Sequence, residues 1–163
     1  MKYQTIIGID PDVHKSGVAF LDTRTKQLEI STLEFYQLIK YIEWAHDRSI
    51  ENNQSLIVII EAGWLNSKSN FHGETGARAQ RIAKNVGANH QTGKHIVDMC
   101  EGIGVDVVLQ KPLNKGWKGR DGKITHEELA YFTGITGKTS QDGRDAGLIA
   151  WNYAGLPMKV KTK

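Results

Sequence analysis

Several features that define whole classes of protein are absent from this sequence. Cys100 is its only cysteine, so the chain can form no internal disulfide and offers no set of thiolates for a zinc cluster. No apolar run reaches the roughly 18 residues of a membrane-spanning helix, and the first residues do not follow the pattern of a signal peptide. We therefore expect a protein of the reducing cytoplasm.

The excess of positive over negative charge is also small. The net charge of +3 is too small to identify a nucleic-acid partner by itself. With 163 residues, 39% of them hydrophobic, the chain has the size and composition of one domain with its own core. We expect this domain to span residues 1–158, followed by a flexible basic tail at 159–163.

Four acidic residues stand at the ends of apolar segments. One β-branched run ends in Asp10 and a second apolar run ends in Glu61, while Asp142 and Asp145 open an apolar helical segment near the C-terminus. Carboxylates that meet cannot all stay ionised without compensation, and oxygen ligands suit Mg²⁺ or Mn²⁺. The pattern predicts a metal site built from these four acids. For Asp142 and Asp145 the alternative is a favourable charge pair at a helix N-terminus.

The order of the predicted elements indicates an α/β fold. Three short strands with short connections should form an antiparallel meander, and the two later strands should be separated from it and from each other by helices. Capping signals mark the helix starts. Trp44 and Trp151 lie in helical patterns and are expected to pack inside. The strands are predicted at 5–9, 17–21, 27–30, 56–60 and 105–109. The first helix is predicted from a capping box of Ser31 and Glu34 to about Asp47, and the second over 77–101. A third helix should start at a capping box of Thr125 and Glu128, and the last at the N-cap Ser140.

This order is that of the ribonuclease-H-like fold, with a five-stranded mixed sheet whose first three strands are antiparallel and which is flanked by helices. The chain also resembles the RuvC-type Holliday junction resolvases. The matching motifs are Gly8-Ile9-Asp10-Pro11 with Gly17, then Ile60-Glu61, and finally Asp142 and Asp145 followed by Ala146.

The resemblance implies a crossover junction endodeoxyribonuclease. Asp10, Glu61, Asp142 and Asp145 would be its catalytic, metal-binding residues and would hold two Mg²⁺ or Mn²⁺ ions per active site. Paired cuts in a two-fold symmetric junction imply a homodimer. Its interface is expected on the helix predicted at 77–101, where small residues allow close approach, namely Ala79, Ala83, Gly87 and Ala88.

One position departs from the resolvase pattern. Asp12 stands where the family usually has glycine, and its carboxylate either reaches the metals or caps the local turn. Together with His14 and Lys15, this segment also resembles the catalytic domain of some insertion-sequence transposases.

A Gly-rich basic segment runs from Lys111 to Lys123. The resemblance places Lys111 and Lys123 beside the active site as DNA-binding residues, and Lys115, Lys118 and Arg120 should add non-specific phosphate affinity. The alternative is a solvated loop whose charge keeps the protein in solution.

Two aromatic residues are candidates for a wedge that stacks on bases at the junction. Trp64 follows Glu61 by three residues, and Phe71 lies in the same loop. The alternative for Trp64 is that it covers the edge of the sheet. His72, His90 and His95 lack thiolate partners and are expected at the surface or facing DNA rather than on zinc.

The prediction from sequence is a structure-selective, metal-dependent endonuclease that resolves Holliday junctions by paired symmetric nicks. Two alternatives stay open. One is another ribonuclease-H-like nuclease acting on RNA or on other DNA structures, and the other is a catalytically idle nucleic-acid-binding protein on the same scaffold.

Overall fold

Strands and helices follow one another along the chain in the predicted order. A computed structural model describes residues 2–66 and 75–159. The strands are β1 (Thr5–Asp10), β2 (Ser16–Asp22), β3 (Gln27–Leu33), β4 (Leu56–Glu61) and β5 (Asp106–Gln110), and the α-helices are α1 (Phe35–Glu51), α2 (Gly76–Ile103), α3 (His126–Thr133) and α4 (Gln141–Tyr153). Phe71, His72 and the predicted tail beyond Lys159 lie outside the described residues. Within these ranges, none of the helices combines the length and the apolar composition that a membrane crossing requires.

The five strands form one mixed sheet in the order β3-β2-β1-β4-β5. β1 pairs with β2, and β2 with β3, in antiparallel fashion, while β4 is parallel to both β1 and β5. This pairing confirms the predicted ribonuclease-H-like fold. β1 is the central strand, and its buried side chains belong to two cores, one on each face of the sheet.

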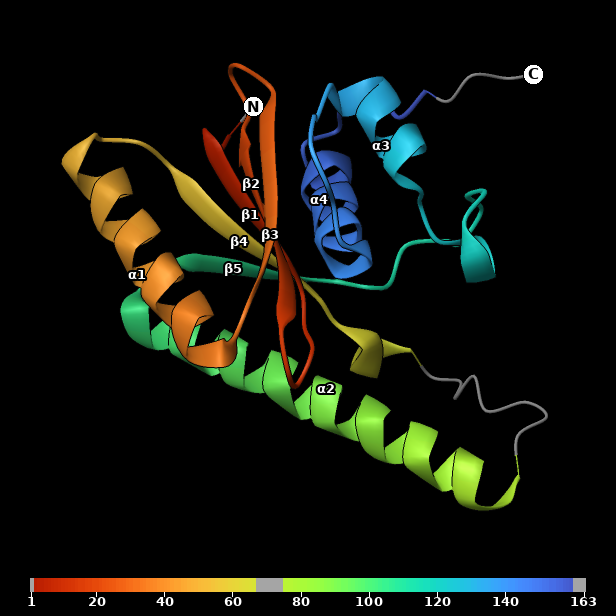
Figure 1. Cartoon of the computed structure of the whole chain (residues 1–163). Helices are drawn as coiled ribbons and strands as arrows, with labels where there is room; N and C mark the ends of the chain where they lie inside the picture. The colour runs from red at the N-terminus through yellow and green to blue at the C-terminus, as the bar shows by residue number, and fades with distance from the viewer. Residues whose placement is uncertain (1, 67–74, 160–163) are drawn as a thin grey trace.

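Alternation along β1 and β4 sorts their side chains between two cores. Ile7 and Ile9 of β1 face the core beneath α1 and α2, whereas Ile6 faces the core beneath α4. Figure 1 shows α1 and α2 on one side of the sheet and α3 and α4 on the other. Because side chains alternate along a strand, Asp10 falls on the α4 side, as does Glu61 at the end of β4.

Helix α4 approaches the sheet closely because glycines face it. A Cβ at position 17 would overlap the backbone oxygen of Asp142, and a Cβ at position 8 would overlap that of Ala146. Gly17 pairs with Asp10 across the β1–β2 ladder. The start of α4 is therefore held directly beside the end of β1.

Two predictions from sequence are wrong in this region. Ser31 does not belong to a capping box, because it pairs with Val18 inside β3; α1 instead starts after Glu34, which forms the box with Gln37. Trp44 is 54% exposed, because α1 buries a neighbouring stripe that includes Ile42 and Ala45. Trp151 is buried as predicted, and the caps at Thr125 and Ser140 are confirmed.

We predict that Gly17→Ala destabilises the protein by about 1–3 kcal/mol or more, because the added methyl group forces α4 away from β2. Urea unfolding measures the change. Gly102→Ala is the matched control: no atom of the described residues outside the helix's own backbone lies within 4 Å of a Cβ there, so alanine should stabilise α2 by up to about 1 kcal/mol. Equal midpoints for the two variants would contradict the close approach of α4.

Candidate metal centre

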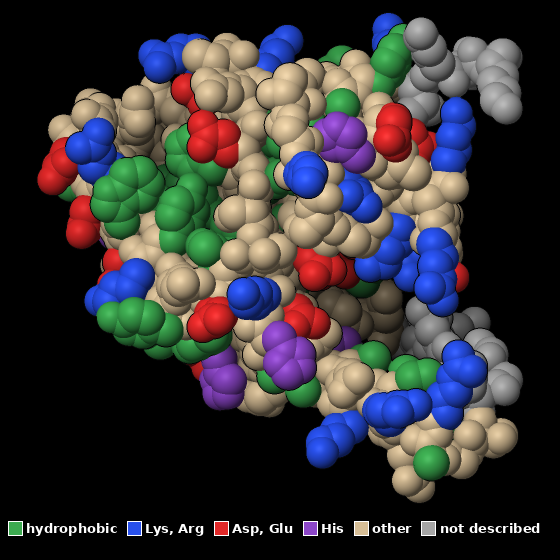
Figure 2. Space-filling view, viewed as in Figure 1, with side chains coloured by type: hydrophobic (Ala, Val, Ile, Leu, Met, Phe, Trp, Pro, Cys, Tyr) green, Lys and Arg blue, Asp and Glu red, His purple; other side chains and the backbone are tan. Residues whose placement is uncertain are grey.

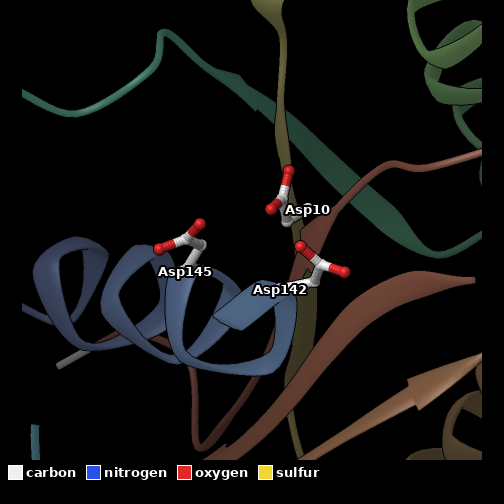
Figure 3. Close-up of side chains that lie close together, drawn as sticks. All are labelled: Asp10, Asp142 and Asp145. Atoms are coloured by element: carbon white, nitrogen blue, oxygen red, sulfur yellow. The ribbon is translucent and has the colours of Figure 1, made fainter. Parts of the chain in front are cut away.

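Three carboxylates meet where β1 ends and α4 begins. Asp10 is the last residue of β1, and Asp142 and Asp145 lie in the first turns of α4. One carboxylate oxygen from each lies within 4.8 Å of the other two. Figure 3 shows the three side chains directed toward one another from the strand and the helix. The predicted convergence of these three acids is thus present in the structure.

Glu61 stands beside this cluster rather than within it. It lines a cavity of about 130 Å³ together with Asp10 and Asp145. Among the described residues, however, the group of acids with mutually close oxygens holds Asp10, Asp142 and Asp145 alone. Glu61 therefore lies at the wall of the same site, where its charge acts on Asp10.

Burial and like charges make the ionised cluster unfavourable. Burial raises the pKa of Asp10 well above its ordinary range, and the charges of Glu61, Asp145 and Asp142 raise it further. Burial is also the main cause that raises the pKa of Glu61 and of Asp142. Lys123 opposes all three shifts without cancelling them.

Asp145 is oriented by two donors. Lys123 Nζ donates to Oδ2 at 3.0 Å, and Gln141 Nε2 donates to Oδ1 at 2.8 Å. Burial lowers the pKa of Lys123, but its hydrogen bond to Asp145 and the nearby carboxylates raise it more, so the pKa rises overall. Gln141 was not among the residues predicted from the sequence, although its position four residues before Asp145 places both on one helical face.

Asp12 belongs to the turn after β1. Its Oδ1 accepts from the backbone N–H of His14 at 2.8 Å and of Lys15 at 3.3 Å, and its Oδ2 accepts from Asn89 Nδ2 at 3.2 Å. Both oxygens are thus occupied by donors. Of the two readings of Asp12, the structure shows the turn cap.

The basic segment contributes unequally to the site. Lys115 and Lys123 line the cavity with the acids, whereas Lys111 is exposed and is not among the cavity's lining residues. Figure 2 shows acidic side chains in a hollow with lysine and arginine on both sides of it. The first turns of α2 carry exposed basic residues that the sequence analysis did not single out, namely Arg78, Arg81 and Lys84.

Trp64 packs against α2. Its ring lies over Gly93 and meets His90 edge-on, with ring centroids 6.0 Å apart. Trp64 and His90 line a second cavity, of about 160 Å³, that also reaches Asp10 and Glu61. A stacking role for Trp64 stays a prediction, and the competing residue Phe71 lies outside the described part of the chain.

The donor set fits a hard divalent cation. The three ligand groups are carboxylates, the preferred ligands of Mg²⁺ and Mn²⁺. Burial, together with the neighbouring carboxylates, raises the pKa of Asp10 and of Asp142 although Lys123 lowers both. The acidic cluster could therefore bind a metal ion, which would supply the missing positive charge.

The fold is similar to that of RuvC from Thermus thermophilus, as seen in a structure of RuvC in complex with a Holliday junction substrate. The two chains are 13% identical, the alignment covers 93% of each, and the TM-score is 0.51. A second structure of Thermus thermophilus RuvC is 16% identical over 93% of this chain and 97% of that chain, with a TM-score of 0.47. No protein-family model and no curated protein sequence matches the chain. At this identity the similarity establishes the fold alone.

We predict that Asp10→Asn stabilises the metal-free protein at neutral pH. Because the folded state raises the pKa of Asp10, ionising this carboxyl costs stability. This cost is absent at low pH, where the group is protonated in both states, and it grows as pH rises from the ordinary carboxyl range through the elevated pKa. Asparagine does not ionise, so the variant does not have this cost.

In EDTA at pH 8, the melting temperature of the variant should exceed that of the wild type, by about 2–4 °C for each kcal/mol, and the difference should shrink toward pH 4. Mg²⁺ should raise the melting temperature of the wild type far more than that of the variant. A pH-independent difference in EDTA would contradict the charge conflict.

Proposed function

We propose that this protein is a metal-dependent endonuclease that cleaves branched DNA and resolves four-way junctions. The observation that carries the proposal is the convergence of Asp10, Asp142 and Asp145, with oxygens within 4.8 Å of one another, on a RuvC-like fold. A protein that only binds nucleic acid gains nothing from three acids that repel both one another and phosphate.

Each acid has a distinct place in the proposed reaction. Divalent cations held by these carboxylates would activate the attacking water and stabilise the leaving oxygen of the phosphodiester. Asp10, on the central strand, would hold the ions together with Asp142 and Asp145 of α4 and with Glu61 at the end of β4. Gln141 and Lys123 keep Asp145 turned toward the cluster.

Positive side chains around the acids would offset their repulsion of DNA. Lys123 is 37% exposed at its side chain while still bonded to Asp145, so its charge is available at the mouth of the site. Lys115 stands on the same wall, and Lys118 and Arg120 extend the positive surface. We expect Arg78, Arg81 and Lys84 on α2 to contact phosphates from the opposite side.

A four-way junction has two-fold symmetry, so the proposed enzyme acts as a homodimer. The first half of α2 extends past the sheet (Figure 1). Its surface there includes exposed Ala83 and Gly87, and among the described residues no neighbouring atom lies within 4 Å of a Cβ at position 87. A helical segment of this length is marginal in water by itself, which favours its packing against a second copy.

Cleavage of labelled four-way junctions, forks and linear duplexes tests the proposal. With Mg²⁺ or Mn²⁺ we expect paired symmetric nicks in the junction and none in EDTA. Asp10→Asn should reduce the rate by more than about hundredfold, since even indirect ligand contacts are worth 10–100-fold. Asp12→Asn is the matched control and should retain activity, because the amide oxygen can still cap the turn, although the bond from Asn89 Nδ2 is lost.

Two outcomes would redirect the proposal. Equal cleavage of RNA or linear DNA would indicate a general nuclease on this fold. Binding without cleavage in either metal would indicate an idle nucleic-acid-binding protein.

A comparison of variants at Lys115 and Lys111 distinguishes a lysine of the active site from one that only adds positive charge to the surface. Because Lys115 lines the cavity and Lys111 does not, we predict that Lys115→Ala lowers the cleavage rate of bound junction by about tenfold or more. Lys111→Ala should weaken binding only, with a salt dependence reduced by roughly one counterion. Single-turnover cleavage at saturating protein measures the first effect and binding at several salt concentrations the second. If Lys111→Ala slowed cleavage and Lys115→Ala weakened only binding, Lys111 would be the lysine of the active site.

A further inference from the structure

Glu128 is a buried acid that the proposed reaction does not use. It is 7% exposed and is the only charged residue in the buried part of the described chain. Its Oε1 accepts from the backbone N–H of Lys118 at 3.0 Å, and its Oε2 accepts from the N–H of Thr125 at 3.0 Å and of Lys118 at 3.2 Å. One carboxylate therefore joins the two ends of the segment 118–125.

Helix capping explains only half of this arrangement. Thr125 and Glu128 form the capping box of α3, in which Glu128 N–H donates to Thr125 Oγ1 at 3.2 Å. From the side chain of Glu128 the capping box needs only the bond to the N–H of the N-cap residue Thr125, and glutamine can also accept that bond. The contact with Lys118 lies ten residues back along the chain and adds nothing to the helix. Its shorter bond, to Oε1, requires a second acceptor oxygen, which glutamate has and glutamine lacks.

The segment held by Glu128 is tightly ordered within itself. Gly119 N–H donates to the oxygen of Lys123 at 3.0 Å, and Lys123 N–H donates to that of Arg120 at 3.1 Å. A Cβ at position 119 would overlap the Lys123 oxygen. Asp121 adopts a left-handed conformation with φ of 55°. These bonds fix the backbone of Lys123, whose side chain reaches Asp145.

The same segment is anchored to the core on its other side. Trp117 N–H donates to the oxygen of Gly122 at 3.1 Å. The Trp117 ring meets that of Phe132, which in turn meets Trp151, with centroids 6.0 and 5.9 Å apart. Glu128 and this aromatic row together turn a Gly-rich basic segment into a fixed wall of the site.

We propose that Glu128 is a positioning residue, which closes the segment 118–125 so that Lys123 is held against Asp145 in the carboxylate cluster. The inference rests on the proposed function for its effect on cleavage. Its effects on segment order and on metal binding are independent of any nuclease activity.

Glu128→Gln tests the proposal because it separates the two halves of the arrangement. With its oxygen toward Thr125 the amide keeps the cap of α3, but its NH₂ group replaces Oε1, so the shorter bond from Lys118 N–H is lost and two donors face each other there. Amide hydrogen exchange by NMR should accelerate about tenfold or more at Gly119 and Lys123, with no change in the amides of α4.

The proposal predicts opposite effects on metal binding and on cleavage. Releasing Lys123 removes a positive charge beside the cluster while Gln141 still orients Asp145, so calorimetry should show Mn²⁺ affinity rising by about fivefold. Junction cleavage should fall by about tenfold or more, because the lysine no longer stands where phosphate enters. A merely weakened fold would lower both.

A double-mutant cycle shows whether Glu128 acts through Lys123. In a Lys123→Gln background, Glu128→Gln should change Mn²⁺ affinity and cleavage by no more than about twofold, because the group through which it acts is gone. Thr125→Ala is the control: it removes the capping hydroxyl, should lower the melting temperature, and should leave Mn²⁺ affinity unchanged. Equal losses in both Lys123 backgrounds would overturn the proposal, as would unchanged exchange in Glu128→Gln.

Two further results keep the outcome clear. If Glu128→Gln does not fold, Gly119→Ala disturbs the same segment from within and should give the same rise in Mn²⁺ affinity; a fall would overturn the proposal. If the wild type cleaves no nucleic acid, the proposed nuclease function fails. Hydrogen exchange and Mn²⁺ binding would still decide the role of Glu128.

Discussion

The close approach of α4 to the central strands is the contact on which the candidate site depends. Gly8 and Gly17 leave no side chain between the sheet and the backbone of α4. Gly143 and Gly147 do the same on the helix, which lies against Ile30 of β3. Layers separated by ordinary side chains lie about 10 Å apart, as stacked sheets do, too far for three short aspartates to share one ion. The site thus depends on these glycines as much as on the acids.

The packing energy of the fold holds together a cluster that electrostatics would disperse. Burial and mutual repulsion raise the pKa of Asp10, and Lys123 offsets the repulsion only in part. Proteins often carry such local conflict at functional sites and compensate for it elsewhere. Here the compensation lies in two apolar cores, one on each face of the sheet.

Much of the fold could be predicted because its signals are local. Apolar runs of five or six residues, capping pairs such as Thr125 with Glu128, and the segment order along the chain were enough for the mixed sheet and its helices. The predictions failed where strand pairing or helix packing overrode local preference. Ser31 has the right spacing for a helix cap, but the ladder with Val18 extends β3 through it. Trp44 is apolar, but the stripe of α1 that meets the sheet passes beside it.

The sequence by itself determined the fold, the two acids at strand ends and the pair that opens α4, because strand alternation and helical spacing decide which face a residue takes. It also placed a basic segment before α3. Only the tertiary structure decided that Asp10, Asp142 and Asp145 meet while Glu61 stands beside them, and that Lys115 rather than Lys111 lines the cavity. These distinctions rest on distances between segments far apart along the chain. Such distances follow from the packing of α4 and the closed segment 118–125, which no local pattern encodes.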